Sequence, residues 1–166
     1  MIRSEWAGGT TAELGAYLRS TVALGAERIE LSTQCSKPCS RLSHLDAAYH
    51  LSVMKGYEIR VAVAADADVL KDLHRQSSLV YEDTRAILIA HPEIFGVSDA
   101  AIRAGHVRVL VSDGRIVAFS TVIPRPDGTG EMEDLFVEPK SMRQGLGREL
   151  IDDAIAIART RGLQRI

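Results

Sequence analysis

From residue 57 onward, apolar positions repeat with a period of two in some stretches and of three to four in others, which indicates alternating strands and helices. Asp113-Gly114 lies between two such strands and is typical of a tight hairpin turn. Strands are predicted at 57–63, 107–111, 116–123 and 131–137, and helices at 66–76, 80–90 and 146–158. A hairpin followed by a strand–helix–strand crossover predicts an α/β (α+β) fold with a mixed, mostly antiparallel sheet and flanking helices.

The amino-terminal third has a pattern of its own, which divides the chain at about residue 56. Thr10-Thr11-Ala12-Glu13 fits a capping box, and leucine and valine follow it at helical spacing. Residues 28–32 alternate like a strand, and residues 45–54 indicate a short helix that Gly56 ends. We therefore predict a helix–strand–helix segment at 1–56 and a core domain at 57–166.

Composition excludes several classes of protein. The chain of 166 residues has a net charge of −2 with scattered positive charges, which argues against a nucleic-acid partner. Its apolar stretches are too short to cross a bilayer, and no secretory signal is visible, so we expect a cytoplasmic protein without a membrane partner. Cys35 and Cys39 precede His44 and His50 at a spacing too short for a zinc finger, so we predict free thiols and no metal.

The most informative segment is the turn Arg143-Gln144-Gly145-Leu146-Gly147, which joins the strand at 131–137 to the helix at 146–158. A helix amino terminus presents unpaired N–H groups and a positive dipole end, and the two glycines let a diphosphate approach the backbone. Arg143 and Arg148 add positive charge at the rim. The alternative is a tight turn without a ligand, and neither the P-loop nor the Rossmann spacing is present.

The wider context Leu135-Phe-Val-x-Pro-x-x-x-Arg-Gln-Gly-Leu-Gly-Arg-x-Leu150 closely resembles the central motif of the GNAT superfamily of N-acetyltransferases. Residues 59–66 resemble the family's first strand and the entry to its first helix, and residues 114–120 resemble its third strand. The resemblance covers residues 57–166. Met142 departs from the arginine or glutamine common in the family, which removes one side-chain contact at most because backbone N–H groups hold the phosphates.

This resemblance implies acetyl-CoA as co-substrate and an amine of a small molecule or peptide as acceptor. The residues that it assigns to the cofactor are Phe136, Val137, Arg143, Gln144, Gly145, Leu146, Gly147 and Arg148. The amine attacks the thioester directly, and the backbone N–H of Phe136 or Val137 stabilises the oxyanion. The acceptor pocket is expected from loops and early helices, within 77–104.

A carboxylate base must take the proton of the attacking amine. Glu131 stands where some members of the family have a glutamate base, and Glu133 is expected on the same face of the strand. Asp134 is expected on the opposite face and is the weakest candidate, while Glu138 and Glu149 are interpreted as surface charges. The alternative for Glu131 and Glu133 is that both are solvated strand residues.

Residues 12–57 resemble the carboxy-terminal third of the same family, because Gly162–Ile166 and Gly25–Ile29 are alike and a strand and helix follow the latter. In the family, a fifth strand follows the helix that the glycine turn begins. The resemblance suggests a permuted or fused chain in which this fifth strand comes from the same molecule or is exchanged within a homodimer. Ser52 then occupies the position of the family's thiolate-protonating tyrosine, with Tyr49 nearby. The alternative for residues 12–57 is an unrelated extension. The alternative function for the chain is that of a catalytically impaired module that binds CoA or dimerises.

Overall fold

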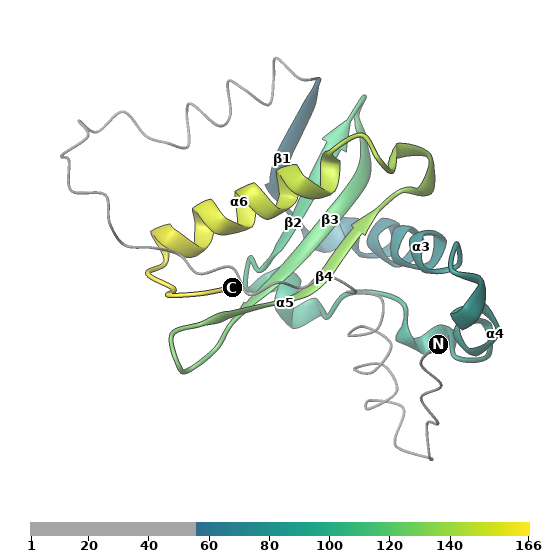
Figure 1. Ribbon diagram of the computed structural model, residues 1–166, viewed down its shortest axis with the longest axis horizontal. Helices are drawn as coiled ribbons and strands as arrows, with labels where there is room; N and C mark the ends of the chain where they lie inside the picture. Colours follow the sequence, from purple (N-terminus) through teal and green to yellow (C-terminus); the bar gives the residue numbers. More distant parts are fainter. Residues whose placement is uncertain (1–55) are drawn as a thin grey trace.

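The computed structural model describes residues 56–166 (Figure 1). The described elements are β1 (Tyr57–Val61), the 3-10 turn η1 (Ala64–Asp66), α3 (Ala67–Ser78), α4 (Glu82–Ala90), the 3-10 turn η2 (Pro92–Ile94), α5 (Asp99–Arg103), β2 (Val107–Ser112), β3 (Arg115–Pro124), β4 (Gly130–Val137), the 3-10 turn η3 (Pro139–Ser141) and α6 (Leu146–Thr160). The predictions for residues 1–55, including those for the two cysteines, Tyr49 and Ser52, lie outside the described residues.

The four described strands form one sheet in the order β1-β2-β3-β4, and every neighbouring pair is antiparallel. Asp113 and Gly114 join β2 to β3 with positive φ angles of 49° and 71°. Two consecutive residues with positive φ give the turn whose twist matches the flanking strands. The predicted hairpin and the mostly antiparallel sheet with flanking helices are therefore confirmed.

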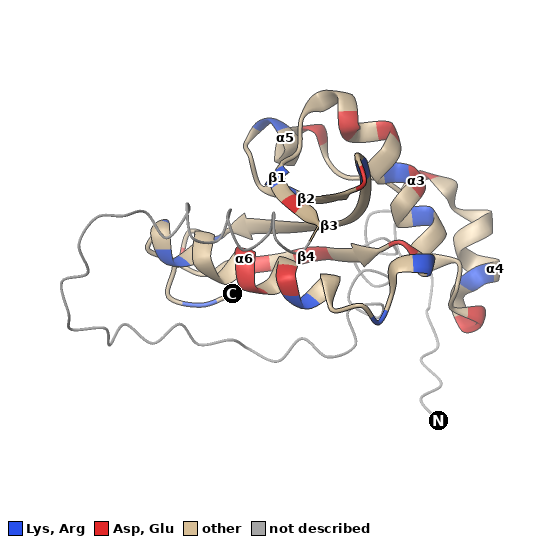
Figure 2. Ribbon diagram, turned by 90° about the horizontal axis from the view of Figure 1, so that it is seen from above, with Lys and Arg blue, Asp and Glu red and all other residues tan. Residues whose placement is uncertain are grey.

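Helices cover both faces of the sheet. In Figure 2 the sheet is seen edge-on, with α6 on one side and α3 and α5 on the other. The core on the α3 side includes Leu70, Val109, Phe119 and Phe136, and the core on the α6 side includes Leu110, Ala118 and Leu150. Because β3 lies between two strands and is covered on both faces, its central residues, such as Phe119, are fully buried.

The helix α6 follows the apolar stripe that the sequence predicts. Leu150, Ala154 and Ala158 recur every fourth residue and are buried against the sheet. The helix ends before Gly162, whose φ of 71° is the left-handed conformation common after a helix. The chain then returns to the start of β4, where Gln164 N–H donates to Gly128 O at 2.9 Å and Gly130 N–H donates to Arg165 O at 2.7 Å.

A β-bulge in β4 changes which side chains share a face. Glu131 pairs with Ile123 and Asp134 pairs with Thr121, so Glu133 is an extra residue in the strand. Because Ile123 and Thr121 are two residues apart on β3, their partners Glu131 and Asp134 lie on one face, the α3 side. The prediction that Asp134 points away from the face of Glu131 is therefore wrong, since simple alternation does not continue through a bulge.

The entry to α3 is held by a charged side chain. Asp66 accepts two hydrogen bonds from the Arg60 guanidinium, at 2.7 and 2.9 Å, and one from Val63 N–H at 2.8 Å. Asp66 is the last residue of η1, and its carboxylate caps this turn by accepting from the N–H of the N-cap residue Val63. The hydrogen bond from Arg60 is the main reason that the pKa of Asp66 is lower than its ordinary value.

We expect Asp66→Asn to lower the free energy of unfolding by about 1–3 kcal/mol at pH 7, because a part-buried guanidinium loses its charged partner. A carboxylate with a lowered pKa in the folded state stabilises the protein above its unfolded pKa, and this stabilisation is lost as the pH falls through the folded value. The difference between the two proteins should therefore shrink below about pH 4. Urea unfolding from pH 3 to pH 8 measures it, and a difference independent of pH would contradict the assignment.

Candidate functional site

The turn before α6 has a left-handed backbone at two positions. Arg143 and Gly145 both have positive φ angles, of 61° and 85°, and Gly145 is the N-cap residue of α6. The first hydrogen bond of the helix runs from Glu149 N–H to Gly145 O at 3.2 Å. The N–H groups of residues 145–148 therefore precede the hydrogen-bonded ladder of the helix and are available to an anion.

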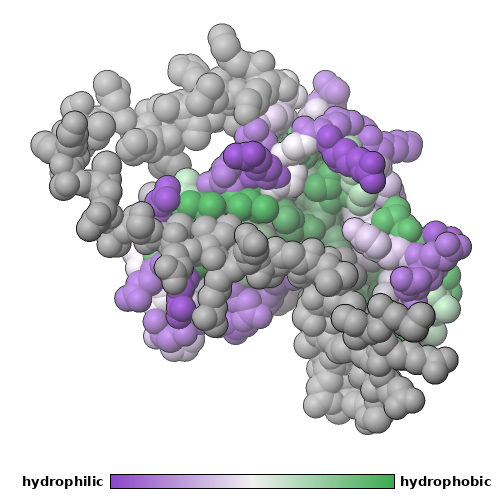
Figure 3. All heavy atoms as spheres, viewed as in Figure 1, coloured by the Kyte–Doolittle hydropathy of each residue, from purple (hydrophilic) through white to green (hydrophobic). Residues whose placement is uncertain are grey.

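Space is available in front of this turn. A Cβ atom built on Gly145 would have no heavy atom within 4 Å, and residues 143–145 are exposed. The end of the molecule at which β4 passes into α6 is mostly hydrophilic on the face drawn in Figure 3. Gly147 differs, because a Cβ there would lie 3.8 Å from Val137 Cγ2. Gly145 thus leaves room on the solvent side, and Gly147 lies close to the end of β4.

Some side chains around the turn hold its backbone in place, and others are exposed to solvent. Gln144 Nε2 donates to Lys140 O at 3.2 Å, which ties the turn to η3. Leu146 packs against the core on the α6 side and so fixes the first turn of the helix. The Arg148 side chain is 86% exposed, and its Nε lies 3.9 Å from the Asp152 carboxylate. Arg143 and Arg148 are thus exposed cations that flank the turn, while Gln144 and Leu146 hold its backbone in place.

The strand that leads into the turn has outward-facing backbone groups. Glu138 N–H donates to Val117 O at 2.7 Å, so the N–H groups of Phe136 and Asp134, at a spacing of two, also point toward β3. The N–H and C=O groups of Leu135 and Val137 then point away from β3, to the outer edge of β4. Of the two N–H donors predicted, Val137 faces outward and Phe136 faces the sheet, and Leu135 is an outward donor that sequence reasoning missed.

The Phe136 side chain is buried among aromatic rings on the α3 side. It stacks on His74 with ring centroids 4.2 Å apart, and His74 meets Phe95 edge-on at 5.5 Å. His74 is only 5% exposed, and its Nδ1 lies 3.2 Å from Gly96 N. Sequence analysis assigned no role to His74, but its ring joins α3 to β4 and to the segment before α5. The apolar residues Leu70 and Leu73, on the same face of α3, were the signal available.

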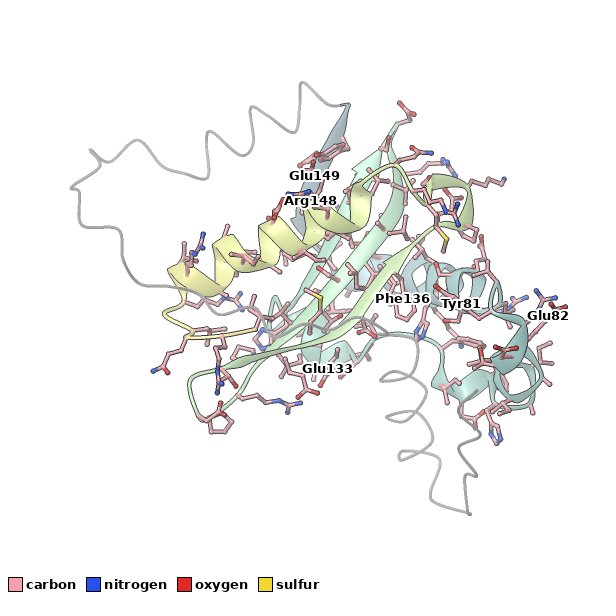
Figure 4. All side chains as sticks on the ribbon, in the orientation of Figure 1. Tyr81, Glu82, Glu133, Phe136, Arg148 and Glu149 are labelled. Atoms are coloured by element: carbon pink, nitrogen blue, oxygen red, sulfur yellow. The ribbon has the colours of Figure 1, made fainter. Side chains whose placement is uncertain are left out.

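The two glutamates predicted as bases lie near each other, bridged by an arginine from the β3–β4 hairpin. Arg125 Nε donates to Glu131 at 2.8 Å, and its Nη2 contacts both Glu131 and, at 3.4 Å, Glu133. The Glu131 side chain is 58% exposed and that of Glu133 38%. In Figure 4, Glu133 lies toward the hairpin end of β4, and Phe136 lies toward the end at which α6 begins. The role of Arg125 had no sequence signal beyond its place in a polar loop.

The described residues contain neither a metal-binding cluster nor a membrane-spanning helix. No group of three or more His, Cys, Asp or Glu side chains there is arranged to hold a metal ion. Within residues 56–166, no helix has the length and apolar character needed to span a membrane.

The sequence model described as the acetyltransferase (GNAT) family matches residues 68–166, more than half of the 166 residues. The chain belongs to the GNAT family. The match begins in α3 and includes β4, the turn and α6, so the family assignment covers each element of the candidate site. It confirms the resemblance predicted from the central motif.

One curated relative of this GNAT chain is the mycothiol acetyltransferase of Corynebacterium efficiens, which is 33% identical over 87 residues. The aligned region covers 49% of this chain and 27% of that protein, so the chain spans about a quarter of the length of the relative.

Solved structures of GNAT proteins are similar in fold. The PaiA N-acetyltransferase of Thermoplasma acidophilum, in complex with coenzyme A, superposes with a TM-score of 0.52 at 17% identity over 64% of this chain and 74% of that chain. A GNAT acetyltransferase of Brucella melitensis in complex with acetyl-CoA gives a TM-score of 0.49 at 18% identity over 64% of this chain and 71% of that one. At such identities the first likeness shows the shared fold alone.

Proposed function

We propose that this chain binds acetyl-CoA and transfers the acetyl group to an amine of a small molecule or a peptide. The observation that carries the proposal is the turn at 143–147, where N–H groups outside the helix ladder meet open space at Gly145. The family assignment supports it, as does the coenzyme A bound by the PaiA N-acetyltransferase of like fold.

In this proposal the turn binds the diphosphate of the cofactor. Two negative phosphates lie at the amino terminus of a helix of 15 residues, where the helix dipole favours negative charge. Backbone N–H groups of residues 145–148 donate to the phosphate oxygens, and Arg143 and Arg148 approach from solvent. The absence of a side chain at Met142 that could donate a hydrogen bond is unimportant here, because the backbone supplies the donors.

The pantetheine arm then extends along the outer edge of β4, away from the turn. Val137 is nearer to the turn and Leu135 farther from it, so the outward N–H of Val137 binds the arm and that of Leu135 faces the thioester at its end. A hydrogen bond from Leu135 N–H stabilises the negative charge that develops on the thioester oxygen when the amine nitrogen attacks the carbonyl carbon. The C–S bond of the thioester breaks, and CoA leaves as its thiolate.

Glu133 is the better placed of the two candidate bases. Glu133 is two residues from Leu135 and Glu131 is four residues from it, so Glu133 lies nearer to Leu135 along the strand. A base must reach the amine directly or through one water molecule, which the shorter separation allows. Arg125 holds both carboxylates at this end of β4. We therefore assign the proton transfer to Glu133 and a supporting electrostatic role to Glu131.

The acceptor is proposed to enter from the side of α4. Val80 and Tyr81, just before that helix, are 42% and 50% exposed, and Ile87 and Ile89 add further exposed apolar surface. These exposed apolar side chains could pack against the carbon skeleton of an amine. Exchange of a segment between two copies and a cytoplasmic location remain predictions, of which the first is tested by the molecular mass of the protein in solution.

Calorimetric titration with CoA and acetyl-CoA, combined with a thiol-release assay, tests the proposed function. The amine panel should contain a peptide with a free amino terminus, an amino sugar and an alkyl diamine. We expect micromolar binding of both nucleotides and thiol release that depends on one class of amine. Binding without amine-dependent thiol release across the panel would favour the CoA-binding module, and the absence of binding would refute the proposal.

A further inference from the structure

Ser77 makes a long-range contact that the mechanism above does not use. Its side chain on α3 is buried, with 2% exposure, and its hydroxyl donates to Val137 O at 2.8 Å across a sequence separation of 60 residues. The register of β4 places this carbonyl on the outer edge of the strand, away from β3. Ser77 therefore binds a backbone group on the edge that the cofactor arm is proposed to follow.

The contact fixes the orientation of one peptide unit from two directions. The Val137–Glu138 peptide donates its N–H to Val117 O at 2.7 Å and accepts the Ser77 hydroxyl on its oxygen at 2.8 Å. Rotation of this peptide about the strand axis would break one or both bonds. His74, one turn earlier on α3, stacks on the preceding residue, Phe136. The end of β4 is thus held by a hydrogen bond to its backbone and by an aromatic contact to its side chain.

We propose that Ser77 is a positioning residue of the acyl-transfer site, which orients the last peptide of β4 and thereby the outward N–H groups of Leu135 and Val137. This inference rests on the proposed function. The N–H groups act on the thioester only if their directions are fixed before the reaction, because small errors in such geometry lower the rate more than they lower binding. The diphosphate turn is held by other contacts, so Ser77 should affect turnover more than affinity.

The chain offers a matched control for this proposal. Ser78 is the next residue of α3 and is 1% exposed, but no hydrogen bond from its hydroxyl to β4 is found in the described part of the chain. Ser77→Ala and Ser78→Ala remove the same atom from neighbouring buried positions. Ser77→Thr keeps the hydroxyl, and Ser77→Cys keeps nearly the same volume with a weaker donor.

The experiment measures kcat with acetyl-CoA, the Kd for CoA and the melting temperature of all four variants. We expect Ser77→Ala and Ser77→Cys to lower kcat by roughly 3- to 10-fold, the worth of one neutral hydrogen bond, with a Kd for CoA within about twofold of the parent. Ser77→Thr should have a kcat close to that of the parent protein, and Ser78→Ala should change kcat little. If Ser77→Ala does not fold, the comparison of the Cys and Thr variants decides.

Equal kcat in the parent and in the Ser77→Cys variant would overturn the proposal, as would equal losses in the Ser77 and Ser78 variants. A loss of CoA affinity as large as the loss of kcat would also overturn the proposal, because a general disturbance of the fold lowers both CoA affinity and kcat. Failure of the parent protein to bind CoA is a different result. It would refute the proposed function itself, without any variant.

Discussion

Replacing Gly145 with glutamate should weaken CoA binding by about 3 kcal/mol, roughly a hundredfold in Kd. The new carboxylate would lie at the amino terminus of α6, in the open space where we place the diphosphate. It would both occupy the N–H donors and repel the phosphates. Calorimetric titration measures the Kd, and thermal unfolding shows whether the variant is folded.

Two further glycine variants separate charge from backbone strain. Gly145→Ala introduces a side chain at a φ of 85°, which costs about 1–2 kcal/mol of stability but adds no charge. Gly147→Ala places a Cβ at an ordinary contact distance of 3.8 Å from Val137 Cγ2. Both should bind CoA better than Gly145→Glu does. Unaltered CoA affinity in a folded Gly145→Glu protein would show that the diphosphate binds elsewhere.

Glu133→Gln should lower kcat by roughly 10²- to 10⁴-fold, the range for loss of a general base, with little change in the Kd for CoA. The amide keeps the shape of the side chain and its hydrogen bond to Arg125, but it cannot take the proton of the attacking amine. Steady-state thiol release with the preferred amine measures this effect.

Glu131→Gln is the matched control, because Arg125 contacts both side chains. We expect a smaller loss of kcat for Glu131→Gln, since this residue lies farther from Leu135 along the strand. A larger loss in Glu131→Gln than in Glu133→Gln would move the base to Glu131 and require a chain of water molecules to carry the proton.

The fold was largely predictable, because the elements that form it carry their own periodic signals. The apolar stripe of α6, the Asp113-Gly114 turn and the mostly apolar run of β3 each depend on residues within about one element of each other. The glycine turn was predictable for the same reason, since strand, turn and helix are consecutive. The role of its residues in binding a diphosphate stays a proposal.

The parts that sequence reasoning missed depend on register. The bulge at Glu133 leaves the composition of β4 unchanged, yet it places Glu131 and Asp134 on one face. The outward direction of the Leu135 N–H follows from the pairing of β4 with β3, which no local pattern specifies. Ser77 and His74 are polar residues on a buried helix face, and their partners lie about 60 residues away. Such contacts become visible only when the two segments are placed together.

The left-handed backbone at Arg143 has a consequence for the thermodynamics of nucleotide binding. A residue with a side chain rarely adopts a φ of 61°, so the surrounding chain must hold this conformation at a cost of about 1–3 kcal/mol. This cost is part of the free energy of folding, so the loop already has its left-handed conformation before a nucleotide binds. Binding should therefore show a small loss of conformational entropy, and calorimetry should find little heat-capacity change beyond that expected from the apolar surface it buries.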